Sequence, residues 1–247
     1  KPDRFQNDLG GGGKLMKKRL GTGITLFVAL IFVLINLPAS PAWAGTGDVV
    51  INETNFPDAT FREYVKTFDT DNDGSLSQKE LDAVTDIDVR DKSIADLKGV
   101  EHFTKLESLY CSKNQLIALD VSQNKVLELL WCGDNKLTSL DVTKNLALTD
   151  FYCDNNQLIA LDVSNNTALK ALGCYNNQVT ALDVSNNKAL EALFCYNNQL
   201  TALDVSKNTG LMSLGCSNNQ LKSLDVSKNT ALKSLSCNEN RLPALDV

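Results

Sequence analysis

The chain has 247 residues, with 24 lysine and arginine side chains against 30 aspartate and glutamate side chains, and a single histidine. Its net charge of −6 at pH 7 disfavours nucleic acid and anionic membrane as partners, because both are polyanions. No nucleophile motif surrounds the one histidine, His102, so we expect it to be structural and the chain to have no enzymatic activity of its own.

The first 44 residues are typical of targeting sequence. Residues 16–44 combine a basic start, an apolar run over 24–37, and the small residues Ala42 and Ala44 where a signal peptidase requires them. We expect a signal peptide cleaved after Ala44, hence a secreted or cell-surface protein with no stable membrane span in the mature chain. The alternative is a membrane anchor, for which the run is short. Residues 1–15 precede a start methionine and are interpreted as leader that is not native protein. Without residues 1–44, 18 basic and 28 acidic side chains remain, a net charge of −10.

The segment FDTDNDGSLSQKEL, residues 68–81, has the spacing of an EF-hand calcium loop. Oxygen ligands stand at loop positions one, three, five, seven, nine and twelve, and these are Asp69, Asp71, Asp73, the carbonyl of Ser75, Ser77 through a water, and Glu80. Gly74 at position six permits the sharp turn. This set predicts a calcium site, and the alternative is an acidic turn that holds no ion.

Apolar residues on both sides of the loop predict two short helices. The spacing of Phe61, Val65 and Phe68 gives an entering helix one apolar face, and Leu81, Val84 and Ile87 do the same for an exit helix. Only one such loop is present, so the second loop with which EF-hands usually pair is missing. We expect residues 45–88 to form a small α-helical, EF-hand-like cap, ordered by calcium, on the N-terminal end of the region that follows.

Residues 84–247 repeat with a step of 21 residues. Cysteines mark the step at Cys111, Cys132, Cys153, Cys174, Cys195, Cys216 and Cys237. The consensus L-x-x-L-x-C-x-x-N-x-L-x-x-L-D-V-S-x-N-x-x has the form of a leucine-rich repeat with cysteine at the third apolar position. It predicts a leucine-rich-repeat solenoid with one short parallel β-strand per repeat and an extended or turn-like back side. One degenerate copy precedes seven regular ones, of which the last is incomplete, so we expect the chain to be part of a longer protein.

The repeating cysteines have three possible roles. In the stretch LYC, Leu109 and Cys111 are expected to point inward and Tyr110 outward. The degenerate copy has Val89 in the cysteine position, which favours a buried column of small apolar groups. Disulfides between neighbouring coils and metal ligation stay open as less favoured alternatives. Two asparagine columns, which begin at Asn114 and Asn124, are expected to hold the turns by bonding backbone groups, including those of neighbouring coils.

The outward positions of the strands vary and are rich in aromatic side chains. Six of the sixteen aromatic residues are expected there, and these are Tyr110, Trp131, Tyr152, Tyr175, Phe194 and Tyr196. Exposed aromatic residues on a rigid sheet favour a partner-binding surface, although they could also shield one another as cross-strand neighbours. A column of aspartates from Asp120 to Asp246 could collect cations, but is expected rather to accept hydrogen bonds from nearby hydroxyls and amides.

Residues 84–247 resemble the internalin-type bacterial leucine-rich repeats, especially those with a cysteine ladder, in the unit LxCxxNxLxxLDVSxN and the lead-in DLKGVEHFTKL. The resemblance implies a curved solenoid whose concave strand face binds a protein or glycan, in a monomeric surface or secreted adhesion protein. The segment from NFPDATFREYV to the calcium loop likewise resembles one that often precedes such repeats in secreted bacterial proteins. Two functions stay open: a non-enzymatic recognition or adhesion module, or the targeting region of a larger secreted enzyme. A pure calcium sensor is less favoured, because the repeats are rigid.

Overall fold

The chain divides into two units, Lys1–Pro38 and Ala39–Val247, and the computed structural model describes residues 47–243, which lie in the second unit. Residues 1–15, the expected signal peptide over 16–44, and Asp246 lie outside the described residues. Across residues 47–243, no helix combines the length and the apolar character that crossing a bilayer requires.

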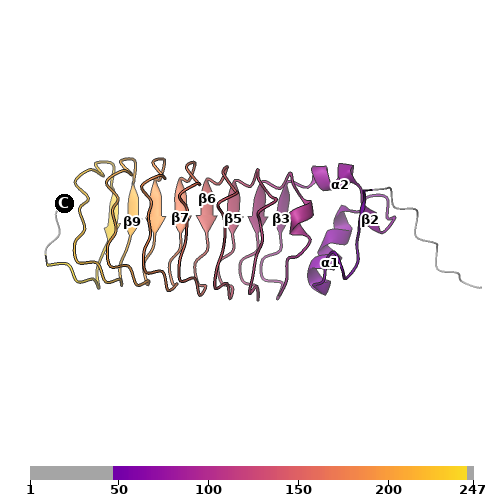
Figure 1. Ribbon diagram of the computed structural model, residues 1–247, viewed down its shortest axis with the longest axis horizontal. Helices are drawn as coiled ribbons and strands as arrows, with labels where there is room; N and C mark the ends of the chain where they lie inside the picture. Colours follow the sequence, from indigo (N-terminus) through magenta and orange to yellow (C-terminus); the bar gives the residue numbers. More distant parts are fainter. Residues whose placement is uncertain (1–46, 244–247) are drawn as a thin grey trace, which may run out of the picture. The chain divides into compact units, whose positions relative to one another are not determined.

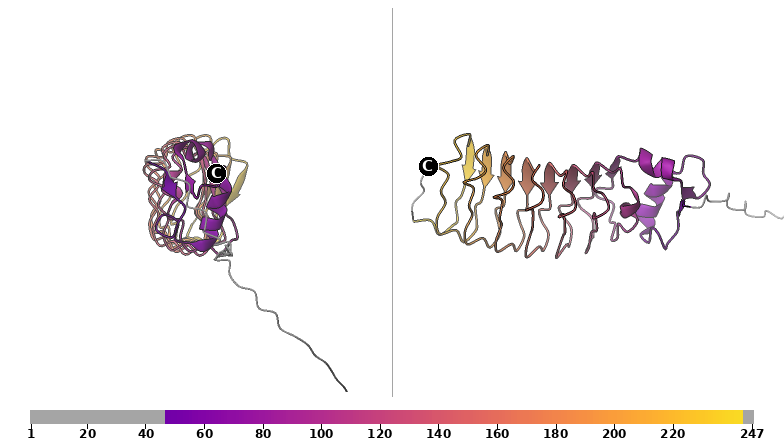
Figure 2. Two further views of the ribbon diagram at one scale, coloured as in Figure 1. Left: turned by 90° about the vertical axis from the view of Figure 1, so that its right-hand side faces the viewer. Right: turned by 45° about the horizontal axis from the view of Figure 1, so that its top comes forward.

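One parallel sheet runs through the repeats, with one strand from each coil (Figure 1). Its eight strands are β3 (Asp86–Asp88), β4 (Ser108–Tyr110), β5 (Leu129–Trp131), β6 (Asp150–Tyr152), β7 (Ala171–Gly173), β8 (Ala192–Phe194), β9 (Ser213–Gly215) and β10 (Ser234–Ser236). They follow one another in sequence order. Both views in Figure 2 place the strands along one wall of the stacked coils, and the opposite wall consists of turns and bends. The predicted solenoid with a turn-like back side is therefore confirmed.

The register of the sheet follows the repeat. Leu109 pairs with Leu130 at the 21-residue step, whereas Ile87 of the degenerate copy pairs with Leu109 at a step of 22. Each coil sends its middle strand residue, its cysteine and its leucine and valine side chains inward, and Leu109, Cys111 and Val121 are all fully buried. Because each coil buries its apolar side chains against its neighbours, these residues form one continuous core.

The asparagine columns join neighbouring coils, as the sequence predicts. Asn135 donates from Nδ2 to the carbonyl oxygens of Cys111 and Cys132, both at 3.0 Å, and its Oδ1 accepts from the amide of Leu116 at 3.0 Å. In the second column, Asn145 donates to the carbonyl oxygens of Val121, at 2.8 Å, and Asn124, at 2.9 Å. A side chain of the first column thus bonds backbone groups of two successive coils, and a side chain of the second column bonds those of the preceding coil, which ties the turns together.

The segment before the repeats forms a small helical cap. It contains β1 (Val49–Val50), α1 (Ala59–Val65), the 3-10 helix η1 (Lys66–Phe68), β2 (Ser75–Leu76) and α2 (Gln78–Ala83), and a second 3-10 helix, η2 (Val100–His102), follows β3. The expected entering helix is present, with Phe61 and Val65 buried. The expectation that Ile87 extends the exit helix is wrong: α2 ends at Ala83, and Ile87 lies in β3 with its side chain in the solenoid core.

The cap packs on the first coil. The ring of Phe103, from the coil, lies 6.5 Å from Phe56 and 5.6 Å from Phe68 of the cap. Asp58, which caps α1 with one carboxylate oxygen, accepts the amide of Ala95 with the other, at 2.9 Å. His102 makes an edge contact with Phe56 at 5.9 Å, in agreement with a structural role. The cap therefore covers apolar core that the N-terminal end of the stack would otherwise expose.

Candidate functional sites: the acidic loop and the strand face

The acidic loop brings three of its six predicted ligands together. Asp69, Asp71 and Asp73 each place a carboxylate oxygen within 4.8 Å of the other two. Asn72, with φ of 59°, and Gly74, with φ of 89°, take the left-handed conformations that turn the chain around this point. Three oxygen donors at this separation are suited to a hard cation such as calcium.

Hydrogen bonds within the loop hold the carboxylates in place. The amide of Gly74 donates to Asp69 Oδ2 at 2.9 Å, and the amide of Ser75 donates to Asp73 Oδ1 at 2.8 Å. Desolvation in the loop and the charges of Asp73, Glu80 and Asp69 raise the pKa of Asp71. The loop thus carries mutual repulsion that a bound cation would relieve.

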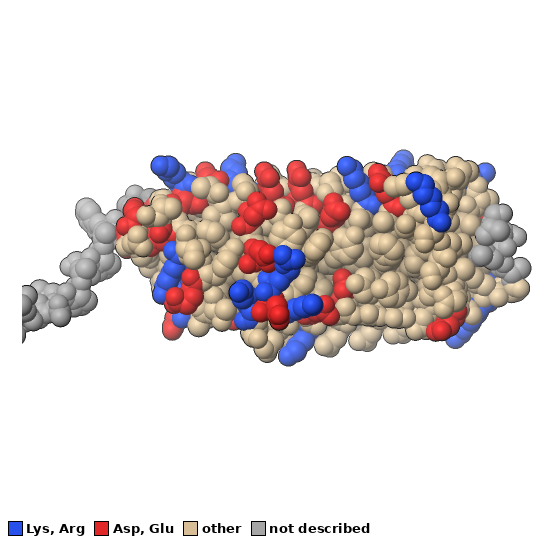
Figure 3. Space-filling model, turned by 180° about the vertical axis from the view of Figure 1, so that it is seen from behind, with Lys and Arg blue, Asp and Glu red and all other residues tan. Residues whose placement is uncertain are grey.

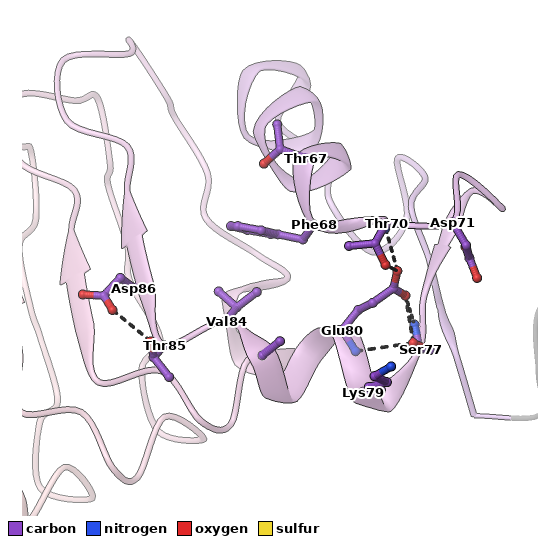
Figure 4. Close-up of a pocket in the computed structure, with 11 residues that line it drawn as sticks. Thr67, Phe68, Thr70, Asp71, Ser77, Lys79, Glu80, Val84, Thr85 and Asp86 are labelled. Carbon is purple, nitrogen blue, oxygen red and sulfur yellow. Dashed lines mark hydrogen bonds between the residues drawn. The ribbon is translucent and has the colours of Figure 1, made fainter.

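Glu80 has a different environment from the three aspartates. Its Oε1 accepts from the amide and hydroxyl of Thr70 at 2.6 and 2.7 Å, and its Oε2 accepts from the amide and hydroxyl of Ser77 at 2.9 and 2.8 Å (Figure 4). These bonds, first that from the Thr70 hydroxyl, lower the pKa of Glu80 to about 2. Ser77 and Glu80 thus form a capping box at the start of α2. To bind an ion through both oxygens, the Glu80 carboxylate must replace these hydrogen bonds with contacts to the ion.

The strand of the loop has a partner that the sequence did not reveal. Val49 and Val50 of β1 pair antiparallel with Leu76 and Ser75 of β2, and the amide of Ile51 donates to the carbonyl of Gly74 at 3.0 Å. In paired EF-hands, a second loop takes this position. The run of β-branched residues over 49–51 is the only sequence signal for this strand.

The first three predicted aromatic residues of the strand face form a row. The Tyr110 and Trp131 rings lie 5.3 Å apart, and the Trp131 and Tyr152 rings lie 5.6 Å apart, both edge to face. Arg90 lies over the Tyr110 ring at 5.0 Å and pairs with Asp88 at 2.6 Å. All three rings remain partly exposed, so they both contact one another and present surface.

The other three aromatic residues form a second group. Tyr175 and Tyr196 are stacked, with ring centroids 4.4 Å apart and an angle of 13° between the planes, and Phe194 occupies the next column. Gly173 separates the two groups: a Cβ atom there would lie 2.5 Å from the Tyr152 ring, so that ring lies against the glycine. The structure thus distributes the six predicted residues over two clusters on one face.

A third column of asparagines, which was not predicted from the sequence, runs beside these clusters. Asn155, Asn176, Asn197 and Asn218 have positive φ and donate from each side chain to the preceding one, as Asn176 does to Asn155 at 2.6 Å. The column ends where Asn155 donates to Asp154 at 2.9 Å. Burial raises the pKa of Asp154, although the Tyr175 hydroxyl bonds to it. The first asparagine of each Asn-Asn pair was the signal.

The aspartate column has a structural role in the described coils. Each of Asp120, Asp141, Asp162, Asp183, Asp204 and Asp225 accepts the amide two residues ahead through Oδ1, at 2.8–2.9 Å. This confirms the hydrogen-bonding interpretation, which the sequence favoured over a collection of cations.

The cysteines are packing residues. All seven are free; Cys111 to Cys216 are buried, and Cys237 is partly exposed. Val89 occupies the same inward column with no exposure. The disulfide and metal alternatives are therefore not supported in the described coils.

Comparison with known proteins agrees with this architecture. No family model matches the chain. Over 70 residues, 28% of the chain, it is 42% identical to Internalin J of Listeria monocytogenes serotype 4b, of which the match covers 8%. The solved functional domain of InlJ from Listeria monocytogenes, whose structure includes a cysteine ladder, is 34% identical over 84% of the chain, with a TM-score of 0.65. Internalin C2 from the same species is 18% identical over 82% of the chain and 93% of its own, with a TM-score of 0.73, and so supports the fold alone.

The chain spans half of the solved InlJ domain and a smaller part of Internalin J. The features that the chain shares with the InlJ domain are the fold and a cysteine ladder. The chain is therefore a leucine-rich-repeat solenoid with a cysteine ladder, and it is similar to the internalin-type proteins.

Proposed function

We propose that the protein is an exported, non-enzymatic bacterial recognition or adhesion module, which binds a protein or glycan ligand on the strand face and carries a calcium-stabilised cap. The observation that carries this proposal is the separation of columns: the inward positions are uniform and buried, whereas the outward strand positions hold two clusters of partly exposed aromatic rings. Aromatic residues on a rigid sheet supply contact area at low conformational cost.

A binding screen against host-type proteins and immobilised glycans tests the strand face. We expect Trp131→Ala and Tyr152→Ala to weaken binding at least tenfold, because each removes a large ring from the first cluster. Ile159→Ala is the matched control, since Ile159 is 64% exposed but lies outside the strands. Equal binding by all three variants would contradict a ligand site on this face.

The calcium part of the proposal rests on the three converging aspartates and the turn that presents them. For an extracellular-type affinity of about 10⁻⁴–10⁻³ M, 10 mM calcium would stabilise the folded chain by about 1.4–2.7 kcal/mol. For a domain of this size that corresponds to a rise in melting temperature of roughly 3–10 °C. The contacts of Phe103 with Phe56 and Phe68 would transmit this stabilisation to the repeats.

Thermal unfolding in 10 mM calcium and in EGTA measures this rise. Asp71→Asn should abolish most of it, while Asp82→Asn, an exposed change in α2 that lies outside the loop, should leave it intact. Identical melting curves for the wild type with and without calcium would refute the calcium site. Export is tested separately: expression of residues 16–247 in a Gram-positive host should release a protein whose first residue is Gly45.

A further inference from the structure

The C-terminal part of the strand face contains a hollow of about 360 Å³ that reaches from β8 to β10. Phe194 and Tyr196 form one side, Gly215 lies at its base, and Ser217, Ser236 and Asn238 form the other side. None of the residues that line it carries a charge. Figure 3, which views the strand side, shows that this half of the face has few charged side chains compared with the half toward the cap.

Gly215 creates the hollow. Preceding coils hold Tyr110, Trp131, Tyr152 and Phe194 in the same outward column. A Cβ atom on Gly215 would lie 3.2 Å from the Phe194 ring and 3.4 Å from the Tyr196 ring, so any side chain there would fill the space beside both rings. The backbone of Gly215 does not have positive φ, and its conformation therefore does not require glycine.

The polar side of the hollow is a connected group of donors and acceptors. The Ser217 and Ser236 hydroxyls lie 2.8 Å apart, and Ser217 donates to Asn238 Oδ1 at 2.6 Å. Hydroxyls retain further acceptor capacity in such an arrangement, and Asn238 also has two amide hydrogens to donate. One side of the hollow thus presents aromatic surface, and the other presents neutral hydrogen-bonding groups.

We propose that this hollow binds a neutral saccharide unit, an inference that rests on the proposed role of the strand face in recognition. The C–H face of a sugar ring packs on Phe194 and Tyr196, whose π faces are electron-rich, while its hydroxyls bond to Ser217, Ser236 and Asn238. An anionic ligand would find no cation in the lining, and a cationic ligand no carboxylate. A purely apolar side chain would cover the serine hydroxyls without replacing their contacts with water.

Saturation-transfer NMR and calorimetry on the chain from residue 45, with glucose, galactose, mannose and their N-acetylamino derivatives as probes, test the proposal. We expect at least one sugar to bind with a dissociation constant of about 1 mM, as befits a ligand of about 12–15 heavy atoms in an open site. Gly215→Leu should weaken it more than tenfold by filling the hollow, and Ser236→Ala by about three- to tenfold. Gly210→Leu is the matched control, because the nearest atom to a Cβ there is the Leu190 carbonyl oxygen at 4.0 Å.

The outcomes separate this inference from the proposed function. If no sugar binds, or if Gly215→Leu binds as the wild type does while retaining its circular dichroism spectrum, the saccharide site is refuted. If, in addition, a larger ligand binds and is lost in Trp131→Ala, the strand face recognises its ligand without this site. A neutral peptide that binds in the hollow where no sugar does would also overturn the proposal. Loss of sugar binding in Gly215→Leu but not in Trp131→Ala supports it.

Discussion

We expect the buried cysteines to make the stability of the protein unusually sensitive to alkaline pH. Burial raises the pKa of Cys174 and of Cys216 to about 12, from an ordinary value of 9.0. The pKa values of Cys111, Cys132, Cys153 and Cys195 are also raised, again mainly by burial. Above pH 9 these thiols stay protonated in the folded chain but lose their protons in the unfolded chain. Their stabilising effect is therefore complete below pH 9 and is lost as pH rises toward the folded-state pKa values.

The size of the effect follows from the number of thiols. At pH 9.5, ionisation of one cysteine in the unfolded chain lowers the free energy of unfolding by about 0.8 kcal/mol, and ionisation of all six lowers it by about 5 kcal/mol. At pH 10 the sum is about 8 kcal/mol, which is comparable with the whole stability of an ordinary domain. The raised pKa values of Tyr152, Tyr175 and Tyr196 act in the same direction, but their ordinary value is 10.0, so the cysteines dominate the window from pH 9 to 10.

Urea unfolding between pH 7.5 and 10, in the presence of a reductant, measures the loss. Cys174→Val is the informative variant, because Val89 already fills the equivalent inward position and valine cannot ionise. It should remove one sixth of the pH dependence, and the double variant with Cys153→Val should remove a third. Stability that stays constant from pH 7.5 to 9.5, or an unchanged slope in the double variant, would show that the thiols are not buried in their protonated form.

Three further results are expected. At pH 8 a thiol reagent should modify Cys237 rapidly and the other six cysteines only on unfolding, so a second fast thiol in the native protein would contradict the packing. Gly99→Ala should lower the free energy of unfolding in urea by about 2–4 kcal/mol, because φ is 105° there and the new Cβ would lie 2.2 Å from the Phe56 ring. A decrease of under 1 kcal/mol would argue against this packing of the cap. Asn187→Ala, which removes two hydrogen bonds to the buried carbonyls of Val163 and Asn166, should cost about 1–3 kcal/mol, against less than 1 kcal/mol for the exposed Asn186→Ala, and equal costs would argue against the inner asparagine column.

The strict repeat made most of the fold predictable. A period of 21 residues fixes which side chains share a column, and alternation along a strand then fixes which columns face inward, so the burial of Leu109 and Cys111 followed directly. The turn of the acidic loop was similarly readable, because its spacing places Asp69, Asp71 and Asp73 on one turn whatever surrounds them. Both predictions depend only on the spacing of residues along the chain.

The features that the sequence did not reveal depend on contacts between distant or dissimilar residues. The pairing of Val49 with Leu76 joins a two-residue strand to the loop across the whole of α1, and no local pattern specifies it. The third asparagine column was obscured because Lys113 and Glu239 take the same left-handed conformation as its asparagines. Ile87 fitted both a helix and a strand, and only the pairing with Leu109 decides between them.

Gly173 and Gly215 show why the strand face needed a structure. Both occupy the outward column of the aromatic rings, and in the sequence both are simply positions without a side chain. The Tyr152 ring lies so close to Gly173 that this position is covered, whereas Phe194 and Tyr196 lie beside Gly215 and leave open space. The difference comes from the direction in which the neighbouring rings lean, which the inward columns do not constrain. Because the core supplies the stability of every coil, the outward residues are free to differ in this way, and a fold built from identical coils can present different surfaces along its length.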